Sequence, residues 1–251
     1  MRILLTNDDG IHAPGLAVLE ALAAQLSDDV WVCAPAEEQS GAGHSLTLHQ
    51  PVRLREHGER RFAVTGTPTD SVNLALRKLF ADRMPDLVIS GVNAGENLGD
   101  DITYSGTISA AMEGALAGIP AIALSQAYRS NGASFSATEQ WGKRVLAPLI
   151  DVTMAKRTLV NVNFPALPAD KVRGIRVARQ GFHDYDRGSL VQGEDPRGRP
   201  YYWFGLQDAE HTLDHGTDLE AIADGYIAVT PLHLDLTHHA AIGALADRFA
   251  Q

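Results

Sequence analysis

The chain has 251 residues, of which 45% are hydrophobic and 21% are charged, a composition typical of a globular protein that can bury a full core. Its formal net charge of -10 argues against a duplex DNA or RNA partner, because binding to a duplex depends on Lys and Arg side chains that neutralise phosphates. The only cysteine is Cys33, which excludes an intrachain disulfide.

No stretch of the sequence predicts a signal peptide or a membrane span. Only three apolar residues lie between Arg2 and Thr6, too few for the core of a signal peptide. The longest small and apolar stretch, residues 114–124, is interrupted by glycines and Pro120. We therefore expect a cytoplasmic protein without a membrane partner.

The first predicted element is a buried strand that ends in two carboxylates. Residues 2–6 form an apolar run of strand length, and Asn7-Asp8-Asp9-Gly10 follows at once. In open α/β sheets, ligands bind at the carboxyl ends of the strands, so Asp8 and Asp9 are candidate ligand-binding residues. Adjacent carboxylates repel each other, and a hard divalent cation would relieve that repulsion. An ordinary polar turn is the alternative reading of this stretch.

The next segments predict a right-handed parallel βαβ unit. Leucines at helical spacing over residues 16–26 are followed by a second short apolar strand at residues 30–35. That strand leads into a polar segment at the same sheet edge, residues 37–45, which we call the Ser40 loop. Residues 53–65 carry two short strand candidates, and the Thr-Pro pair at 67–68 has the cap and first-position residues of a helix.

A further strand, residues 86–90, leads into a long polar loop. This loop spans residues 91–101 and is rich in Gly, Asn and Asp. Loops of this kind often carry the chemistry of α/β proteins. It is followed by Tyr104-Ser105-Gly106-Thr107, which opens an amphipathic helix over residues 108–116.

The remaining pattern predicts the end of the sheet and then an arm. A strand at 119–125, a helix at about 138–150 and a strand at 158–162 are expected to finish the main sheet. Beyond residue 173, short strand candidates occur at residues 175–177, 201–204 and 226–229, and a final helix at residues 240–249. Residues 180–200 hold many charges and glycines, which predicts an extended hairpin that pairs with another subunit.

These elements predict an α/β fold with a Rossmann-like, mostly parallel sheet flanked by helices. We expect residues 1–172 to form the catalytic domain. Residues 173–251 are expected to form a carboxyl-terminal β-hairpin arm and a helix that serve oligomerisation.

Polar clusters are predicted to converge on one edge of this sheet. They are Asp8-Asp9, the Ser40 loop, Asn93 with Asn97, and Ser105-Gly106-Thr107. Neither residues 3–50 nor residues 86–125 contain a Lys or Arg, so an anion bound there must be neutralised in another way. A bound metal ion and the positive end of a helix are the two means that remain.

The residue types at this edge suit metal-assisted chemistry on a phosphate. Together with two carboxylates, the Ser40 hydroxyl and the Asn93 carbonyl complete an all-oxygen shell for magnesium, manganese or calcium, although each alone could simply be a loop hydrogen bond. Residues 105–107 offer backbone N–H groups and hydroxyls to a phosphate, and a plain helix cap is the alternative. Because a metal activates water and offsets phosphoryl charge, the set favours hydrolysis of phosphomonoesters over binding alone.

A series of motifs that covers nearly the whole chain resembles the SurE survival-protein nucleotidases. The motifs are Asn7-Asp8-Asp9-Gly10, Ala13-Pro14-Gly15, Ser40-Gly41, Ser45-Leu46-Thr47, Gly66-Thr67-Pro68-Thr69-Asp70, Ser90-Gly91-Val92-Asn93-Ala94-Gly95, Asn97-Leu98-Gly99-Asp100-Asp101, Tyr104-Ser105-Gly106-Thr107, Asp195-Pro196-Arg197-Gly198, Gly216-Thr217-Asp218 and Thr230-Pro231-Leu232. Each is common by itself, but their order and spacing are specific.

The resemblance implies a metal-dependent nucleotidase that acts on nucleoside 5′- and 3′-monophosphates and, in some members, on short-chain polyphosphate. It implies one Mg²⁺ or Mn²⁺ per subunit, and the implied metal ligands are Asp8, Asp9, Ser40 and Asn93. The implied phosphate contacts are Asn97, Ser105, Gly106 and Thr107. Of the two carboxylates expected to be catalytic, Asp8 and Asp9, we prefer Asp9 as the general base. The family also implies a homodimer or homotetramer with exchanged carboxyl-terminal segments.

Two other functions fit parts of the pattern. The alternative is a non-catalytic protein that senses nucleotide or phosphate in the same cleft. A metal-dependent deacylase would need histidine ligands at the sheet edge, where only His12 and His44 are near.

Further residues are weaker candidates. His211 and His215 have the spacing of a zinc pair, but no helical pattern surrounds them. His12 could donate a proton to the leaving group, although a turn histidine is the simpler reading. Arg197 is the nearest candidate for a basic substrate contact from the arm, and His44 could touch substrate or face solvent.

Overall fold

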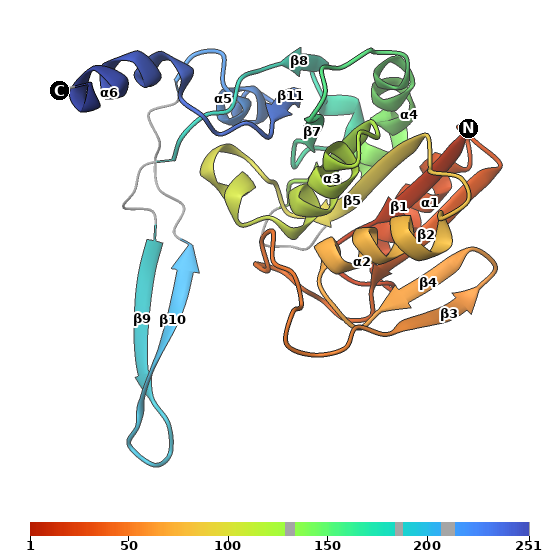
Figure 1. Ribbon diagram of the computed structural model, residues 1–251, viewed down its shortest axis with the longest axis horizontal. Helices are drawn as coiled ribbons and strands as arrows, with labels where there is room; N and C mark the ends of the chain where they lie inside the picture. The colour runs from red at the N-terminus through yellow and green to blue at the C-terminus, as the bar shows by residue number, and fades with distance from the viewer. Residues whose placement is uncertain (129–133, 184–187, 207–213, 251) are drawn as a thin grey trace.

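The computed structural model describes residues 1–128, 134–183, 188–206 and 214–250, and among these residues nine strands form one mixed sheet (Figure 1). The strands lie in the order β3-β4-β2-β1-β5-β6-β7-β11-β8. Their bounds are β1 (Arg2–Thr6), β2 (Asp29–Pro35), β3 (Leu54–Gly58), β4 (Arg61–Val64), β5 (Leu87–Ala94), β6 (Ala121–Gln126), β7 (Thr158–Phe164), β8 (Ile175–Val177) and β11 (Ile227–His233). Neighbouring strands are parallel except β3 with β4 and β7 with β11, so the predicted α/β class is confirmed.

Helices cover both faces of the sheet. Their bounds are α1 (Pro14–Ala23), α2 (Pro68–Leu74), α3 (Gly106–Leu116), α4 (Ser136–Ile150), α5 (Asp218–Ala223) and α6 (Ile242–Phe249), with short helical turns at η1 (Ala75–Leu79), η2 (Gly99–Thr103), η3 (Ala169–Lys171) and η5 (His239–Ala241). One apolar cluster joins the sheet to α1 and α4, and a second joins it to α2 and α3 (Figure 1).

The central strand β1 shows why this sequence is buried on both sides. Ile3 and Leu5 belong to the cluster with α1 and α4, whereas Leu4 belongs to the cluster with α2 and α3. Successive side chains of a strand point to opposite faces, so a strand covered by helices on both faces needs an apolar residue at every position. The continuous apolar run at the start of the chain therefore determines the middle of the sheet.

The strand predicted at residues 86–90 is too short. It continues as β5 to Ala94, and its pairing with β6 shifts register between Ser90 and Asn93. Gly91 allows this shift, since it has φ +132° and a Cβ at its position would lie 2.3 Å from the carbonyl oxygen of Leu124. Asn93 is thus part of a strand and not of a loop.

The prediction that β7 finishes the sheet is also wrong. β11 pairs with β7 in antiparallel register, from Ala228 opposite Asn163 to His233 opposite Thr158, and β8 continues the sheet beyond β11. Periodicity marked the element at β11 but carried no information about its pairing partner, because long-range strand order is a tertiary property.

The predicted arm is a two-stranded antiparallel hairpin of β9 (Gly188–Glu194) and β10 (Pro200–Leu206). It projects away from the sheet and helices in Figure 1. Its tip turns at Asp195, whose Oδ1 accepts hydrogen bonds from the backbone N–H groups of Arg197 and Arg199. No helix in the described part of the chain is long and apolar enough to cross a membrane.

Candidate active site

The ends of three neighbouring strands bring the predicted residues to one edge of the sheet. β2, β1 and β5 are adjacent and parallel, so their carboxyl ends meet. The backbone N–H of Gln39, in the Ser40 loop, donates to the carbonyl oxygen of Asp8 at 2.8 Å. The backbone N–H of Ala94, at the end of β5, donates to Oδ2 of Asp9 at 3.2 Å. The convergence predicted for these segments is therefore present.

Asp8 lies under the first turn of α3. The residue is only 4% exposed, and its Oδ1 accepts a hydrogen bond from the hydroxyl of Thr107. A Cβ at Gly106 would lie 2.7 Å from Cβ of Asp8 and 2.9 Å from its Oδ2, so only glycine fits at this position. Burial raises the pKa of Asp8 to about 6, the Thr107 hydrogen bond opposes the rise, and the neighbouring charge of Asp9 adds to it.

Asp9 is more open than Asp8. Burial raises its pKa above the ordinary value, the hydrogen bond from Ala94 opposes the rise, and the charge of Glu38 adds to it. Two neighbouring carboxyl groups whose ionised forms are both disfavoured need a positive partner at neutral pH. The described residues that line the cavity at Asp9 include no Lys or Arg, so none of them supplies that positive charge.

Ser40 and Asn93 present oxygen atoms at the same edge. The hydroxyl of Ser40 donates to Oε1 of Glu38 at 2.9 Å, and Nδ2 of Asn93 donates to the carbonyl oxygen of Gly95 at 2.9 Å. In both residues the hydrogen-bond donor is used by the protein, which orients the oxygen lone pairs for another partner. Together with two carboxylates, this donor set fits a hard divalent cation.

A cation at this edge would depend on these neutral oxygens. In the described ranges no three His, Cys, Asp or Glu side chains gather as a group that could hold a metal ion. A site with two carboxylates would therefore need hydroxyl and amide oxygens to complete its shell. This composition favours magnesium or manganese over zinc, which prefers nitrogen and sulfur ligands.

The residues predicted to contact phosphate fall into two groups. Ser105 caps α3, since its Oγ accepts from the N–H of Ile108 at 3.1 Å, and Gly106 and Thr107 begin the helix beside Asp8. The first N–H groups of a helix have no carbonyl partner within it and attract anions. Asn97 is held differently, because its Nδ2 donates to Oγ of Ser125 at 2.8 Å.

The backbone of Asn97 also belongs to a buried polar network. Its N–H donates to Oδ1 of Asn163 at 2.8 Å, and its carbonyl oxygen accepts from the side-chain amides of Asn161 and Asn163. Sequence reasoning missed both asparagines. The sequence did contain a signal for them, since the two asparagines alternate with apolar residues in a strand whose length and composition indicate burial.

His44 fastens the Ser40 loop to the helices. Its Nε2 lies 2.5 Å from Oε1 of Glu113 on α3, and Oε2 of the same carboxylate accepts from Nδ2 of Asn73 on α2. One residue earlier, the N–H of Gly43 donates to the carbonyl oxygen of Tyr104 at 3.1 Å. His44 thus contacts Glu113, a partner that neither of the two roles considered for it had included.

Asp70 anchors the far end of this region. Its Oδ2 accepts from Oγ1 of Thr47 at 2.5 Å and from the N–H of Thr67 at 2.9 Å, and its Oδ1 accepts from the N–H of Thr47 at 3.1 Å. Burial opposes ionisation of Asp70, but these hydrogen bonds outweigh it and hold the pKa below its ordinary value of 3.8.

Replacing Asp70 with alanine is expected to destabilise the protein by about 2 kcal/mol and to lower the melting temperature by about 4–8 °C. Because the pKa is lowered in the native state, the stabilisation is present above pH 3.8 and is lost as the pH falls through the native pKa. The difference between wild type and variant should therefore shrink in acid. Thermal melts at several pH values measure it, with the exposed Asp82→Ala as the control; equal losses in both variants would contradict this role.

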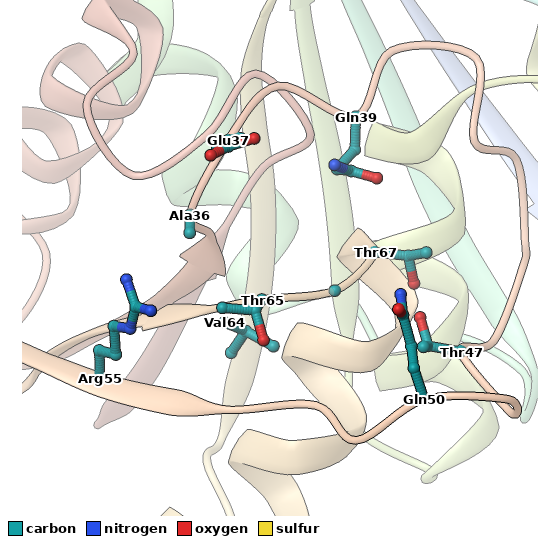
Figure 2. A pocket seen from close by; sticks show the side chains of 10 residues that line it. Ala36, Glu37, Gln39, Thr47, Gln50, Arg55, Val64, Thr65 and Thr67 are labelled. Atoms are coloured by element: carbon teal, nitrogen blue, oxygen red, sulfur yellow. The ribbon is translucent and has the colours of Figure 1, made fainter.

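Two cavities lie on opposite sides of residues 36–40. The first, of about 420 Å³, is lined by Asp9, Ser40 and Glu38, together with Ala13, Pro14, Gly15, Ala94 and Tyr128. The second, of about 330 Å³, is lined by Glu37 and Gln39 and reaches Arg55 on β3 (Figure 2). Alternate side chains of this segment therefore line different cavities, and the guanidinium of Arg55 belongs to the one without Asp9.

Comparison with known proteins agrees with the motifs. The profile of the family described as Survival protein SurE matches residues 3–187. The chain belongs to the SurE family. Proteins named 5′-nucleotidase SurE from Erythrobacter litoralis and Rhizorhabdus wittichii are 68% and 60% identical, over 99% and 97% of this chain and 100% and 98% of their own lengths. The crystal structure of SurE protein from Aquifex aeolicus superposes with a TM-score of 0.87 at 39% identity, covering 99% of this chain and 100% of that chain.

Other candidate residues of this SurE-family chain have different surroundings. The exposed His12 ring packs against His57 on β3, with ring centroids 5.5 Å apart. Arg197 lies in the turn between β9 and β10, where its N–H donates to Oδ1 of Asp195, and this hairpin projects away from the sheet (Figure 1). His215 is exposed and its Nδ1 lies 3.0 Å from Oε1 of Glu220, whereas His211 falls outside the described residues.

Proposed function

We propose that this SurE-family protein is a metal-dependent nucleotidase that hydrolyses nucleoside 5′- and 3′-monophosphates to nucleoside and phosphate. One observation carries the proposal: the carboxylate pair Asp8 and Asp9 stands at the sheet edge with Asp8 held against the first turn of α3. A cation-binding pair and an anion-binding helix start are thus adjacent. The name 5′-nucleotidase, borne by close relatives, supports a nucleotide as the substrate. Short-chain polyphosphate is a further candidate, since its terminal phosphoryl group is likewise transferred to water, with a phosphate and not a nucleoside as the leaving group.

We propose that one Mg²⁺ or Mn²⁺ per subunit is held by the carboxylates of Asp8 and Asp9 and the oxygens of Ser40 and Asn93. The cation would supply activation of water and neutralisation of phosphoryl charge. Two hydrogen bonds support this ligand set. Ser40 donates its hydroxyl hydrogen to Glu38 and Asn93 donates an amide hydrogen to Gly95, so the side-chain oxygens of Ser40 and Asn93 can serve as metal ligands.

The remaining roles follow from where each residue lies. Asp9 lines the cavity with Ser40, so its carboxylate would lie next to the attacking water and is our preferred proton acceptor. The N–H groups at Gly106 and Thr107 would bind phosphoryl oxygens at the start of α3, with Ser105 capping the helix. Asn97, tied to Ser125, would support this phosphate site.

Release of inorganic phosphate from AMP, 3′-AMP and tripolyphosphate tests the proposal. We expect turnover of the monophosphates with Mg²⁺ or Mn²⁺, loss of at least about 100-fold in excess chelator, and recovery when the metal is restored. Because the donors are hard oxygens, Mn²⁺ or Mg²⁺ should restore more activity than Zn²⁺. AMP binding without phosphate release under any metal would favour the alternative, a nucleotide sensor that uses the same cleft.

We also propose a homodimer or homotetramer that exchanges its carboxyl-terminal segments. The hairpin and α6 support this, because they expose large apolar side chains that a free monomer rarely leaves in water. They are Leu190, Val191, Tyr201, Tyr202, Trp203 and Phe204 on the hairpin and Ile242, Leu245 and Phe249 on α6. A partner's hairpin could also carry its Arg197 toward this chain's site.

A cytoplasmic location is proposed on the chemistry of the single cysteine. Cys33 is a buried free thiol, and burial raises its pKa to about 12. A chain without disulfides suits a reducing compartment.

A further inference from the structure

Tyr128 is an exposed aromatic residue at the mouth of the candidate active site. It follows the carboxyl end of β6, in the same row of strand ends as Asp9 and Asn93, and is 49% exposed. It lines the cavity of about 420 Å³ together with Asp9 and Ser40. A cavity of this size lies within the range of small-ligand sites, roughly 300–1,000 Å³, and can hold a nucleoside.

The ring lies beside Gly95, which directly follows the end of β5 and lies two residues after Asn93. The Cβ position of Gly95 is 3.6 Å from Cε1 of Tyr128 and 3.7 Å from Nδ2 of Asn93, so both side chains border the same small space. Gly95 itself has φ +126°, a conformation that side-chain-bearing residues rarely adopt. The tyrosine is therefore close to Asn93, one of the proposed metal ligands.

Hydrogen bonds anchor the backbone directly before Tyr128. Nε2 of the buried Gln126 donates to the carbonyl oxygens of Ala127, Phe164 and Pro165, and its Oε1 accepts from the N–H and hydroxyl of Thr138. The N–H of Ala127 also donates to the carbonyl oxygen of Phe164 at 2.9 Å. A tyrosine side chain has only two rotatable bonds, so it loses little freedom when a flat ligand stacks on it.

Tyr128 also has open space on a second side. It lines another hollow, of about 260 Å³, whose wall includes Pro165, Leu167 and Glu96. The ring thus stands between two hollows, one of which contains Asp9. The active-site hollow adds the apolar Ala13 and Pro14 and no described Lys or Arg. These surroundings suit an uncharged flat ring better than a second anion.

We propose that Tyr128 is the stacking platform for the nucleobase of the substrate. The inference rests on the proposed nucleotidase function. It adds a contact to the nucleobase, which Asp8 and Asp9 at the sheet edge do not recognise. A base stacked on Tyr128 would extend away from the phosphate bound beside Asp9 and Gly106. Purines, with the larger ring surface, should gain more from the platform than pyrimidines.

The test compares AMP with ribose 5-phosphate, which has the same reacting group and no base. Tyr128→Ala is expected to lower kcat/KM for AMP about 10-fold, mainly through KM, and to leave kcat/KM for ribose 5-phosphate within twofold. Tyr128→Phe keeps the ring and should behave as wild type. Tyr128→Leu keeps an apolar side chain without a ring and should behave as Tyr128→Ala.

Different results would contradict the stacking role and the nucleotidase proposal. Equal losses of Tyr128→Ala on AMP and ribose 5-phosphate, no loss on AMP, or full activity of Tyr128→Leu would overturn the stacking role. A second measurement is the inhibition of AMP hydrolysis by inorganic phosphate and by adenosine. Tyr128→Ala should weaken inhibition by adenosine and leave inhibition by inorganic phosphate unchanged. If the wild type releases phosphate from neither substrate with Mg²⁺ or Mn²⁺, the nucleotidase proposal itself fails. Because Tyr128 is half exposed, a thermal melt should show all three variants folded.

Discussion

Replacing Asp8 with asparagine is expected to abolish phosphate release from AMP, with a loss in kcat/KM of at least about 10³-fold. The change removes one negative charge from the proposed cation site and keeps the volume of the side chain. Its amide oxygen can still accept the hydrogen bond from Thr107, so the packing under α3 should survive. Phosphate release assayed with excess Mg²⁺ or Mn²⁺ measures the effect.

The thermal stability of Asp8→Asn, unlike its activity, should not fall. Burial raises the pKa of Asp8 to about 6, which means that at neutral pH the folded protein bears the cost of a buried carboxylate when no cation is bound. A neutral asparagine avoids that cost, so the metal-free variant should melt at the same temperature as the metal-free wild type or higher.

A matched control lies on the other side of the Ser40 loop. Glu37 lines the cavity of Arg55, not that of Asp9, so Glu37→Gln removes a neighbouring negative charge without touching the proposed site. It should retain activity within about threefold. Turnover of Asp8→Asn close to wild type, with the control behaving as expected, would rule out the proposed metal site.

Replacing Gly15 with alanine is expected to destabilise the protein by about 3 kcal/mol or more and to lower the melting temperature by about 6–12 °C. A Cβ on Gly15 would lie 1.9 Å from the carbonyl oxygen of Val92 and 3.2 Å from Cζ of Phe135. The clash is between the backbones of α1 and β5, so no side-chain rotation can relieve it. Thermal or denaturant unfolding measures the loss.

The same substitution should also lower activity, since Val92 directly precedes Asn93 on β5. Gly243 provides the matched control: it lies in α6, and nothing described lies within 4 Å of its Cβ position. Gly243→Ala should be neutral or slightly stabilising because alanine is the better helix former. Equal melting temperatures for Gly15→Ala and wild type would contradict the close approach of α1 to β5.

Local patterns predicted most elements, and their errors have physical causes. The apolar run of β1 and the Thr67-Pro68 helix start are where the sequence indicated them. The extension of β5 to Ala94 was missed because glycine and asparagine are turn formers, whereas here neighbouring strands hold them in a sheet. The edge formed by β11 and β8 was missed because pairing order depends on contacts far apart in the chain.

The sequence predicted which segments form the candidate site better than it predicted the contacts that their side chains make. The polar ends of β1, β2 and β5 meet as expected, and the family assignment is confirmed. Thr107 was expected to contact phosphate, and in the structure its hydroxyl binds Asp8. Tyr128 drew no attention in the sequence, because an isolated tyrosine after a strand carries no pattern of its own.

The sequence by itself determined the α/β class, the polar strand ends and the lack of Lys and Arg in the segments that form them, because these depend on residue type and short-range spacing. Only the tertiary structure decided which oxygens share a cavity, that His44 contacts Glu113, and that Tyr128 lies beside Gly95 at the end of β5. The reason is that side chains from distant segments are brought together by packing of the sheet and helices, and spacing along the chain carries no record of those distances.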